Sequence, residues 1–184
     1  MFDRYLFCKF TPFKQRNNMT LSRIITGILL ITAIASGCKK MEEYSIIPSI
    51  GFKSLYTDRD ASGFDTKAHV VITFTDGDGD IGYYSSGNGS PYDDTTSQYY
   101  SNFHIKLFEK RNGAWVQNAI KFQGRMPYLT PEGSNKALKG EIAMELPLPL
   151  SAVKDTIRYD IFIYDRALHQ SNTVTTSEIV INTQ

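Results

Sequence analysis

The stretch HVVITFTDGDGDIG, residues 69–82, decides the fold and the candidate chemistry of this chain. Val70, Ile72 and Phe74 recur with the two-residue period of a β-strand that buries one face. The alternation ends abruptly in aspartates that are separated by single glycines. The stretch therefore predicts a half-buried strand that carries a cluster of carboxylates to one end of the fold.

The cluster consists of Asp76, Asp78 and Asp80. Residues two apart lean to the same side of an extended chain, and the glycines between them permit backbone angles that other residues avoid. Three like charges around one point repel one another unless a cation lies among them, and calcium accepts oxygen ligands at flexible angles. We therefore predict a calcium site, with an acidic turn as the alternative. An EF-hand is excluded, because Ile81 and Gly87 stand where that loop has glycine and glutamate.

Other segments have the period of β-strands, and none has the period of an amphipathic helix. Residues 155–165 are apolar on both faces, as in a central strand, and Asn112-Gly113 predicts a tight hairpin because both turn positions need positive φ. The pattern predicts an all-β, antiparallel two-sheet sandwich that forms a single domain over residues 46–184. About seven strands are expected, at residues 46–56, 69–75, 102–110, 115–122, 136–146, 155–165 and 173–182, with the faces of Phe103, Ile142 and Ile161 buried together and a polar turn at 57–66.

The first fifth of the chain is predicted to be a signal peptide, residues 1–37. Arg23 precedes an apolar run at 24–35 that is too short to span a bilayer and ends in small residues. The sequence Ala-Ser-Gly-Cys that ends at Cys38 resembles the lipobox of bacterial lipoproteins, which implies a lipid, such as palmitate, on that cysteine. Met19 lies just before this signal and is the expected start.

Residues 38–45 are the expected tether between the lipid and the folded domain. Lys39 follows the cysteine where an inner-membrane lipoprotein of enteric bacteria has aspartate, so the resemblance implies the outer membrane. Glu42 and Glu43 resemble the acidic export tag of Bacteroidota lipoproteins, and a solvated linker is the alternative. The expected location is therefore the outer membrane, on its periplasmic face or at the cell surface.

Cysteine usage and charge limit the class of protein. Cys8, the other cysteine, lies upstream of the predicted cleavage point, so the mature chain would form no disulfide and would depend on its core or on a metal. After removal of residues 1–37, 15 Lys and Arg stand against 18 Asp and Glu, a net charge of −3. A nucleic-acid partner is not expected from this charge.

Three segments, FTDGDGDIG, IKLFEK and DTIRYDIFIYDRALHQSNTVTT, resemble an uncharacterised family of Bacteroidota lipoproteins. Residues 159–172 are similar to the penultimate strand and loop of bacterial Ig-like and fibronectin-like domains, which implies an Ig-like or fibronectin III-like sandwich. Leu168 and His169 depart from the D-x-A-G-N pattern of that loop. In such a topology the loops at 76–101 and 166–172 share one pole, together with the loop at 123–136. Asp165 would then join the three aspartates as a fourth metal ligand.

The loop at 81–101 is rich in tyrosine and poor in aliphatic residues. Loops of this length are often functional, and exposed aromatic side chains with polar tips suit binding surfaces, including platforms for sugar rings. The alternative is that these rings pack together as the loop's own core. The candidate ligand-binding residues are Tyr83, Tyr84, Tyr92, Tyr99 and Tyr100.

These features predict a non-enzymatic binding module of the cell envelope, with a glycan or a protein as its partner. Catalysis has little support, because His69, His104 and His169 lack the spacing of a zinc site and no G-x-S-x-G elbow is present. Two alternatives stay open. One is a glycan-processing enzyme that uses the aspartates, and the other is a structural subunit of an envelope complex.

Overall fold

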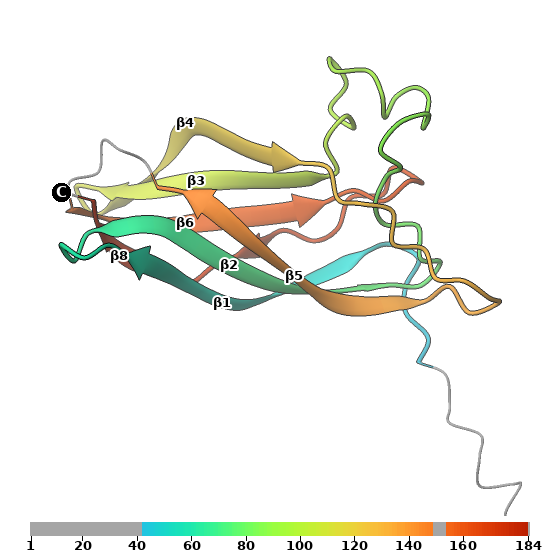
Figure 1. Ribbon diagram of the computed structural model, residues 1–184, viewed down its shortest axis with the longest axis horizontal. Coiled ribbons are helices and arrows are strands. Elements are labelled where there is room, and N and C mark those ends of the chain that lie inside the picture. The colour runs from blue at the N-terminus through green and yellow to red at the C-terminus, as the bar shows by residue number, and fades with distance from the viewer. Residues whose placement is uncertain (1–41, 149–153, 184) are drawn as a thin grey trace, which may run out of the picture. The chain divides into compact units, whose positions relative to one another are not determined.

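The computed structural model describes residues 42–148 and 154–183 (Figure 1). Every helix or strand among them is a β-strand, and the strands form two antiparallel sheets with the orders β1-β2-β5 and β4-β3-β6-β7, in which β8 also pairs with β6. The strands are β1 (Ser49–Arg59), β2 (Asp65–Asp76), β3 (Phe103–Arg111), β4 (Ala114–Gly124), β5 (Leu138–Pro147), β6 (Lys154–Ile163), β7 (Val174–Thr175) and β8 (Ile179–Asn182).

Strand β2 is the centre of the three-stranded sheet, between β1 and β5. Its apolar face is buried as predicted, since Val70 and Ile72 are fully buried and Phe74 nearly so. Ile72 lies opposite Phe52 of β1 and Ile142 of β5, so β2 receives apolar neighbours from both sides. The strand therefore fixes the position of the aspartates that follow it.

Strand β6 has the same central place in the five-stranded sheet, between β3 on one side and β7 and β8 on the other. Tyr159, Ile161 and Ile163 are fully buried. Strands β3 and β4 are joined by the predicted two-residue turn, in which Asn112 has φ 51° and Gly113 has φ 80°. The hairpin prediction is confirmed.

Buried apolar residues of the two sheets form one core. Phe103 and Ile161 from the five-stranded sheet belong to it, and Ile142 from the three-stranded sheet packs against it. The prediction of a shared core is confirmed. The architecture is an antiparallel two-sheet β-sandwich, as predicted.

The structure narrows the turn predicted at 57–66 to residues 60–64, because β1 and β2 both extend further than expected. The carboxylate of Asp60 accepts hydrogen bonds from the backbone N–H groups of Ser62 (2.8 Å) and Phe64 (3.0 Å). These bonds satisfy the backbone of a tight turn, so the polar residues on either side are free to pair as strand.

The single closing strand predicted at 173–182 is divided into β7 and β8. At the break, the side chain of Thr176 accepts a hydrogen bond from the backbone N–H of Tyr159 (3.0 Å), where a backbone carbonyl would serve in a continuous strand. The Thr176 hydroxyl also donates to the carbonyl of Ser177 (2.9 Å). A side chain thus replaces one step of the ladder, which is why the described residues form eight strands and not the expected seven.

The predicted signal peptide, Cys38 and the first part of the tether lie outside the described residues. In the part of the chain that is described, no helix has the length and apolar character needed to cross a membrane. The end of the tether contacts the sandwich. The backbone N–H of Gly77 donates to the carbonyl of Ser45 (2.7 Å), and Glu42 forms an ion pair with Lys139 (3.1 Å).

Candidate functional site

Three loops that are far apart in the sequence meet at one pole of the sandwich. Ile81 forms an isolated β-bridge with Asp165, and the backbone N–H of Arg166 donates to the carbonyl of Asp80 (3.1 Å). The backbone N–H of Leu129 donates to the carbonyl of Ile81 (3.3 Å). The sequence prediction of a shared loop pole is confirmed.

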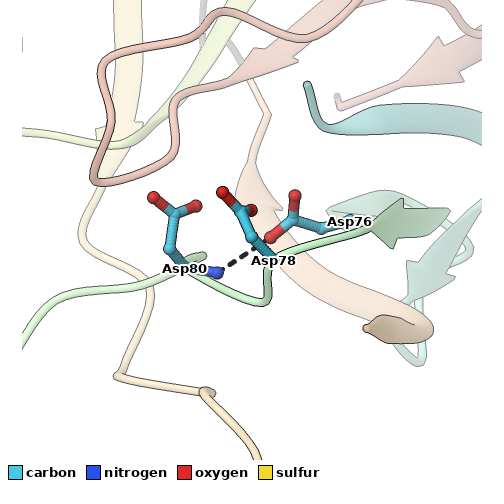
Figure 2. Close-up of side chains that lie close together, drawn as sticks. All are labelled: Asp76, Asp78 and Asp80. Carbon is cyan, nitrogen blue, oxygen red and sulfur yellow. Dashed lines mark hydrogen bonds between the residues drawn. The ribbon is translucent and has the colours of Figure 1, made fainter. Parts of the chain in front are cut away.

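The aspartate cluster lies at this pole, where β2 ends. Asp76 is fully buried, Asp78 is exposed and Asp80 is half-buried, yet each offers a carboxylate oxygen that lies within 4.8 Å of the other two. Figure 2 shows the three carboxylates side by side, with the backbone N–H of Asp80 donating to Asp76 Oδ2 (2.9 Å). The alternation of aspartate and glycine therefore does bring the three charges to one point.

The two glycines of the cluster are needed for close packing. A Cβ atom on Gly79, which has φ +66°, would lie 1.9 Å from the carbonyl oxygen of Lys136. A Cβ atom on Gly77 would lie 2.3 Å from the carbonyl oxygen of Tyr44. The backbone of the tether and that of the loop before β5 thus pack directly against the aspartate loop and hold its shape.

Two carboxylate oxygens of the cluster, Asp76 Oδ1 and Asp80 Oδ1, are buried without a hydrogen-bond partner. Burial, followed by the charges of Asp78 and Asp80, raises the pKa of Asp76 to about 7. Burial, followed by the charges of Asp165 and Asp78, raises the pKa of Asp80 to about 6. Without a cation, the cluster thus stays ionised at neutral pH only at a free-energy cost.

Asp165, the predicted fourth ligand, is fully buried beside the cluster, near enough for its charge to act on Asp80. Its Oδ1 accepts the backbone N–H of His169 (2.7 Å), and its Oδ2 lies 2.9 Å from Nδ1 of the same residue. Both carboxylate oxygens thus have partners within the loop. The three oxygens that converge within 4.8 Å come from the other aspartates, and Asp165 orders its own loop. Its role as a fourth metal ligand stays a prediction.

Arg166 is a functional residue that the sequence reasoning missed. Its Nη1 donates to the carbonyls of Ile81 (3.2 Å) and Gly82 (2.8 Å), and its Nη2 donates to Thr130 Oγ1. Thr130 Oγ1 in turn donates to the carbonyl of Gly79 (2.6 Å). Arg166 therefore joins all three loops of the pole. The only signal for Arg166 in the sequence was the adjacent Asp165. Without that neighbour, Arg166 reads like any solvated arginine.

Four of the five candidate tyrosines are buried or half-buried against neighbouring side chains. Tyr83 is buried and lies between the ring of Tyr92, 5.0 Å away between centroids, and the guanidinium of Arg125, 5.0 Å from its ring. Arg125 also lies over Tyr100 (4.8 Å). Tyr99 is half-buried against the edge of a neighbouring tyrosine ring at 5.1 Å. Tyr83 and Tyr92 thus pack on each other within the loop, whereas Tyr99 packs on Tyr164 and Tyr100 lies under Arg125 of another loop. Their role in ligand binding stays a prediction.

Tyr84 differs from the other four, because 53% of its surface is exposed. Its ring stacks on that of Tyr128, with 4.1 Å between centroids and 13° between the planes. Tyr128 is also exposed and was not among the candidate residues. Of the predicted platform, Tyr84 thus remains available to a ligand, with a partner from a different loop.

Three carboxylates converge at the pole, and two of them have a buried oxygen without a hydrogen-bond partner. Backbone hydrogen bonds between the loops hold them in place. Such a set of hard oxygen donors fits a divalent cation of the calcium type. Comparison of the chain with protein-family models, with curated proteins and with solved structures found no match.

Proposed function

We propose that this protein is a lipid-anchored β-sandwich of the cell envelope, that calcium holds its loop pole, and that it binds a glycan or a protein without catalysing a reaction. The observation that carries the proposal is Asp76, whose carboxylate is fully buried with one oxygen unpaired beside two further carboxylates. An isolated charge in such a place is costly. A bound cation removes that cost.

The donor set supports calcium over other metals. Asp76, Asp78 and Asp80 provide hard oxygens, whereas zinc and copper sites draw on imidazole nitrogen or thiolate sulfur. Magnesium requires a tight octahedron and gives up its water reluctantly. The three aspartates lie on an irregular loop with one exposed member, and an ion of flexible coordination suits that arrangement better.

An ion at this position would stabilise more than its own loop. Asp80 accepts the backbone N–H of Arg166 through its carbonyl, and that of Ala167 through its Oδ2 (2.9 Å). Holding Asp80 in place therefore also holds the loop that follows β6. The proposed role of calcium is structural: it fixes the surface on which the exposed Tyr84 stands.

Calcium should raise the melting temperature of the protein, and a chelator should lower it. An ion that binds only the folded state adds about 2.7 kcal/mol at a hundredfold excess over Kd. Asp78→Asn should remove most of this response, because the amide lacks the charge that binds the ion. The variant should still fold, because Asp78 is exposed and the amide has nearly the same size and shape. Scanning calorimetry with calcium, magnesium and chelator makes the measurement, and we expect magnesium to do less.

Glu132→Gln is the matched control, since Glu132 is an exposed acid of another loop at the same pole and loses the same charge. It should respond to calcium like the wild type. The calcium site would be refuted if neither calcium nor chelator changed the melting temperature of protein that elemental analysis finds free of metal. The cluster would then be an acidic turn. Glycan hydrolysis that disappears in Asp78→Asn would contradict the non-enzymatic part of the proposal.

The lipid anchor is the second part of the proposal and rests on the lipobox resemblance at Cys38. In the native host, the wild-type protein should incorporate labelled palmitate and sediment with the outer membrane. Cys38→Ala should lose the label and leave the membrane fraction, whereas Cys8→Ala should change neither. Unchanged mass and fractionation in Cys38→Ala would refute the anchor.

A further inference from the structure

The outer face of the five-stranded sheet carries cations without partners. Among the lysine and arginine side chains that the structure describes, Lys106, Lys121 and Arg158 make no hydrogen bond and no ion pair, whereas the others have an acid or a carbonyl partner. Arg158 Nε is in addition buried and unpaired. All three residues lie on one sheet face, so their free charges form a single patch.

Two of these charges face each other directly. Lys106 of β3 lies opposite Lys121 of β4 in the strand register, and like charges in that position destabilise a sheet. On its other side, Lys106 lies opposite Asp160 of β6, which brings one negative charge to the face. Asp160 accepts a hydrogen bond from Thr175 Oγ1 (2.7 Å), and Glu178 pairs with Lys110 (3.2 Å). Two acids thus stand against four cations, Lys106, Lys110, Lys121 and Arg158, so the described side chains give the face a net positive charge although the mature chain is predicted to be negative.

Two of the three cations lie over aromatic rings. The guanidinium of Arg158 lies 4.3 Å from the ring of Trp115, and the ammonium of Lys106 lies 5.6 Å from the ring of Phe162. His104 stacks on Phe162 with 4.9 Å between centroids and nearly parallel planes. A cation that lies over a ring keeps its charge, and the ring supplies apolar surface. The face can therefore make both ionic and apolar contacts with a ligand.

A hollow of about 310 Å³ opens between β3 and β4 on this face. Phe162 and the two facing lysines line it, together with three glutamines whose side-chain amides have no partner among the described residues. Amides bind hydroxyl groups, ammonium groups bind carboxylates, and a ring packs on the apolar side of a sugar. The glutamines are Gln98, Gln117 and Gln123.

We propose that this sheet face binds an acidic saccharide, a chain of sugar rings that carry carboxylates. One acidic ring occupies the hollow between Lys106 and Lys121, and Arg158 meets a second acid further along the sheet. The inference goes beyond the proposed function, because it assigns an acidic ligand to a surface other than the loop pole, and it does not rest on the calcium site.

The test is calorimetric titration of the purified full-length chain with a hexamer of galacturonate. Saturable binding is expected, and it should weaken as the salt concentration rises. The methyl ester of the same hexamer keeps the rings and removes the charges, and it should not bind. Lys106→Gln/Lys121→Gln should weaken binding of the hexamer at least about tenfold, a loss of about 1.4 kcal/mol.

Lys53→Gln/Lys139→Gln is the matched control, because both lysines are exposed on the three-stranded sheet and the change in charge is the same. It should bind like the wild type. Equal losses in the two double variants would reduce the effect to net charge and overturn the inference. The inference would also be overturned by no saturable binding, by equal binding of the ester, or by binding of phosphatidylglycerol vesicles but not of the hexamer. Failure here with an intact calcium response would leave the calcium site standing.

Discussion

At the scale of single residues, Gly82 determines whether two of the loops at the pole can come into contact. It has φ +87°, and a Cβ atom on it would lie 1.9 Å from the carbonyl oxygen of Pro127. Directly beside it, the backbone N–H of Tyr83 donates to the carbonyl of Met126 (2.9 Å). The left-handed backbone and the close approach of a second chain both require glycine at this position.

Gly82→Ala should therefore destabilise the protein far more than Gly87→Ala. Gly87 also has positive φ, at +79°, but nothing lies within 4 Å of a Cβ atom there. Gly87→Ala thus measures the backbone strain alone, about 1–2 kcal/mol. Gly82→Ala adds a collision with backbone and should lose at least about twice that free energy of unfolding. Urea denaturation compares the two variants, and equal losses would show that the loops separate without cost.

At the scale of the elements, the alternating segments could be predicted because burial of one face leaves a period in the sequence. The inward face of β2, the two-residue turn at Asn112 and the central place of β6 all follow from local pattern and turn chemistry. The meeting of the three loops at one pole could also be predicted, because strands that alternate in direction place every second loop at the same end of the sandwich. The convergence of the three aspartates was predicted from their spacing alone.

Contacts between a side chain and a distant backbone leave no such period, and these were not predicted. Asn172 accepts the backbone N–H of Ile50 and donates to its carbonyl, both at 2.8 Å, and so ties β1 to the loop after β6. The break between β7 and β8 depends in the same way on the Thr176 hydroxyl. The burial of Tyr83 depends on Arg125, about forty residues later, which the local composition of the loop cannot reveal.

At the scale of the whole molecule, the two charged regions are of opposite sign and lie in different places. Carboxylates gather at the loop pole, around Asp76, and unpaired cations gather on the outer face of the five-stranded sheet, around Lys106. The pole is suited to a small cation, and the sheet face to a larger anion.

This separation allows the electrostatic cost of the pole to be measured through the stability of the whole protein. The pKa of Asp76 is about 7 and that of Asp80 about 6 in the folded protein, whereas both are near 4 in an unfolded chain. Above pH 4 the metal-free folded state therefore holds more protons than the unfolded state. Its free energy of unfolding should fall as the pH rises to about 7, by an amount on the order of a few kcal/mol.

Urea denaturation in chelator, at pH values from about 4.5 to 8, follows this fall. His104 opposes it, because burial lowers its pKa and the stability it contributes is lost as the pH decreases. The comparison with Asp76→Asn/Asp80→Asn removes that contribution, since the variant keeps His104 but has no carboxylates to titrate at these two positions. The wild type should lose stability relative to the variant as the pH rises, and added calcium should abolish the loss at about pH 7.5 because the ion then replaces the protons. Parallel curves for the two proteins in chelator would show that the buried carboxylates carry no cost.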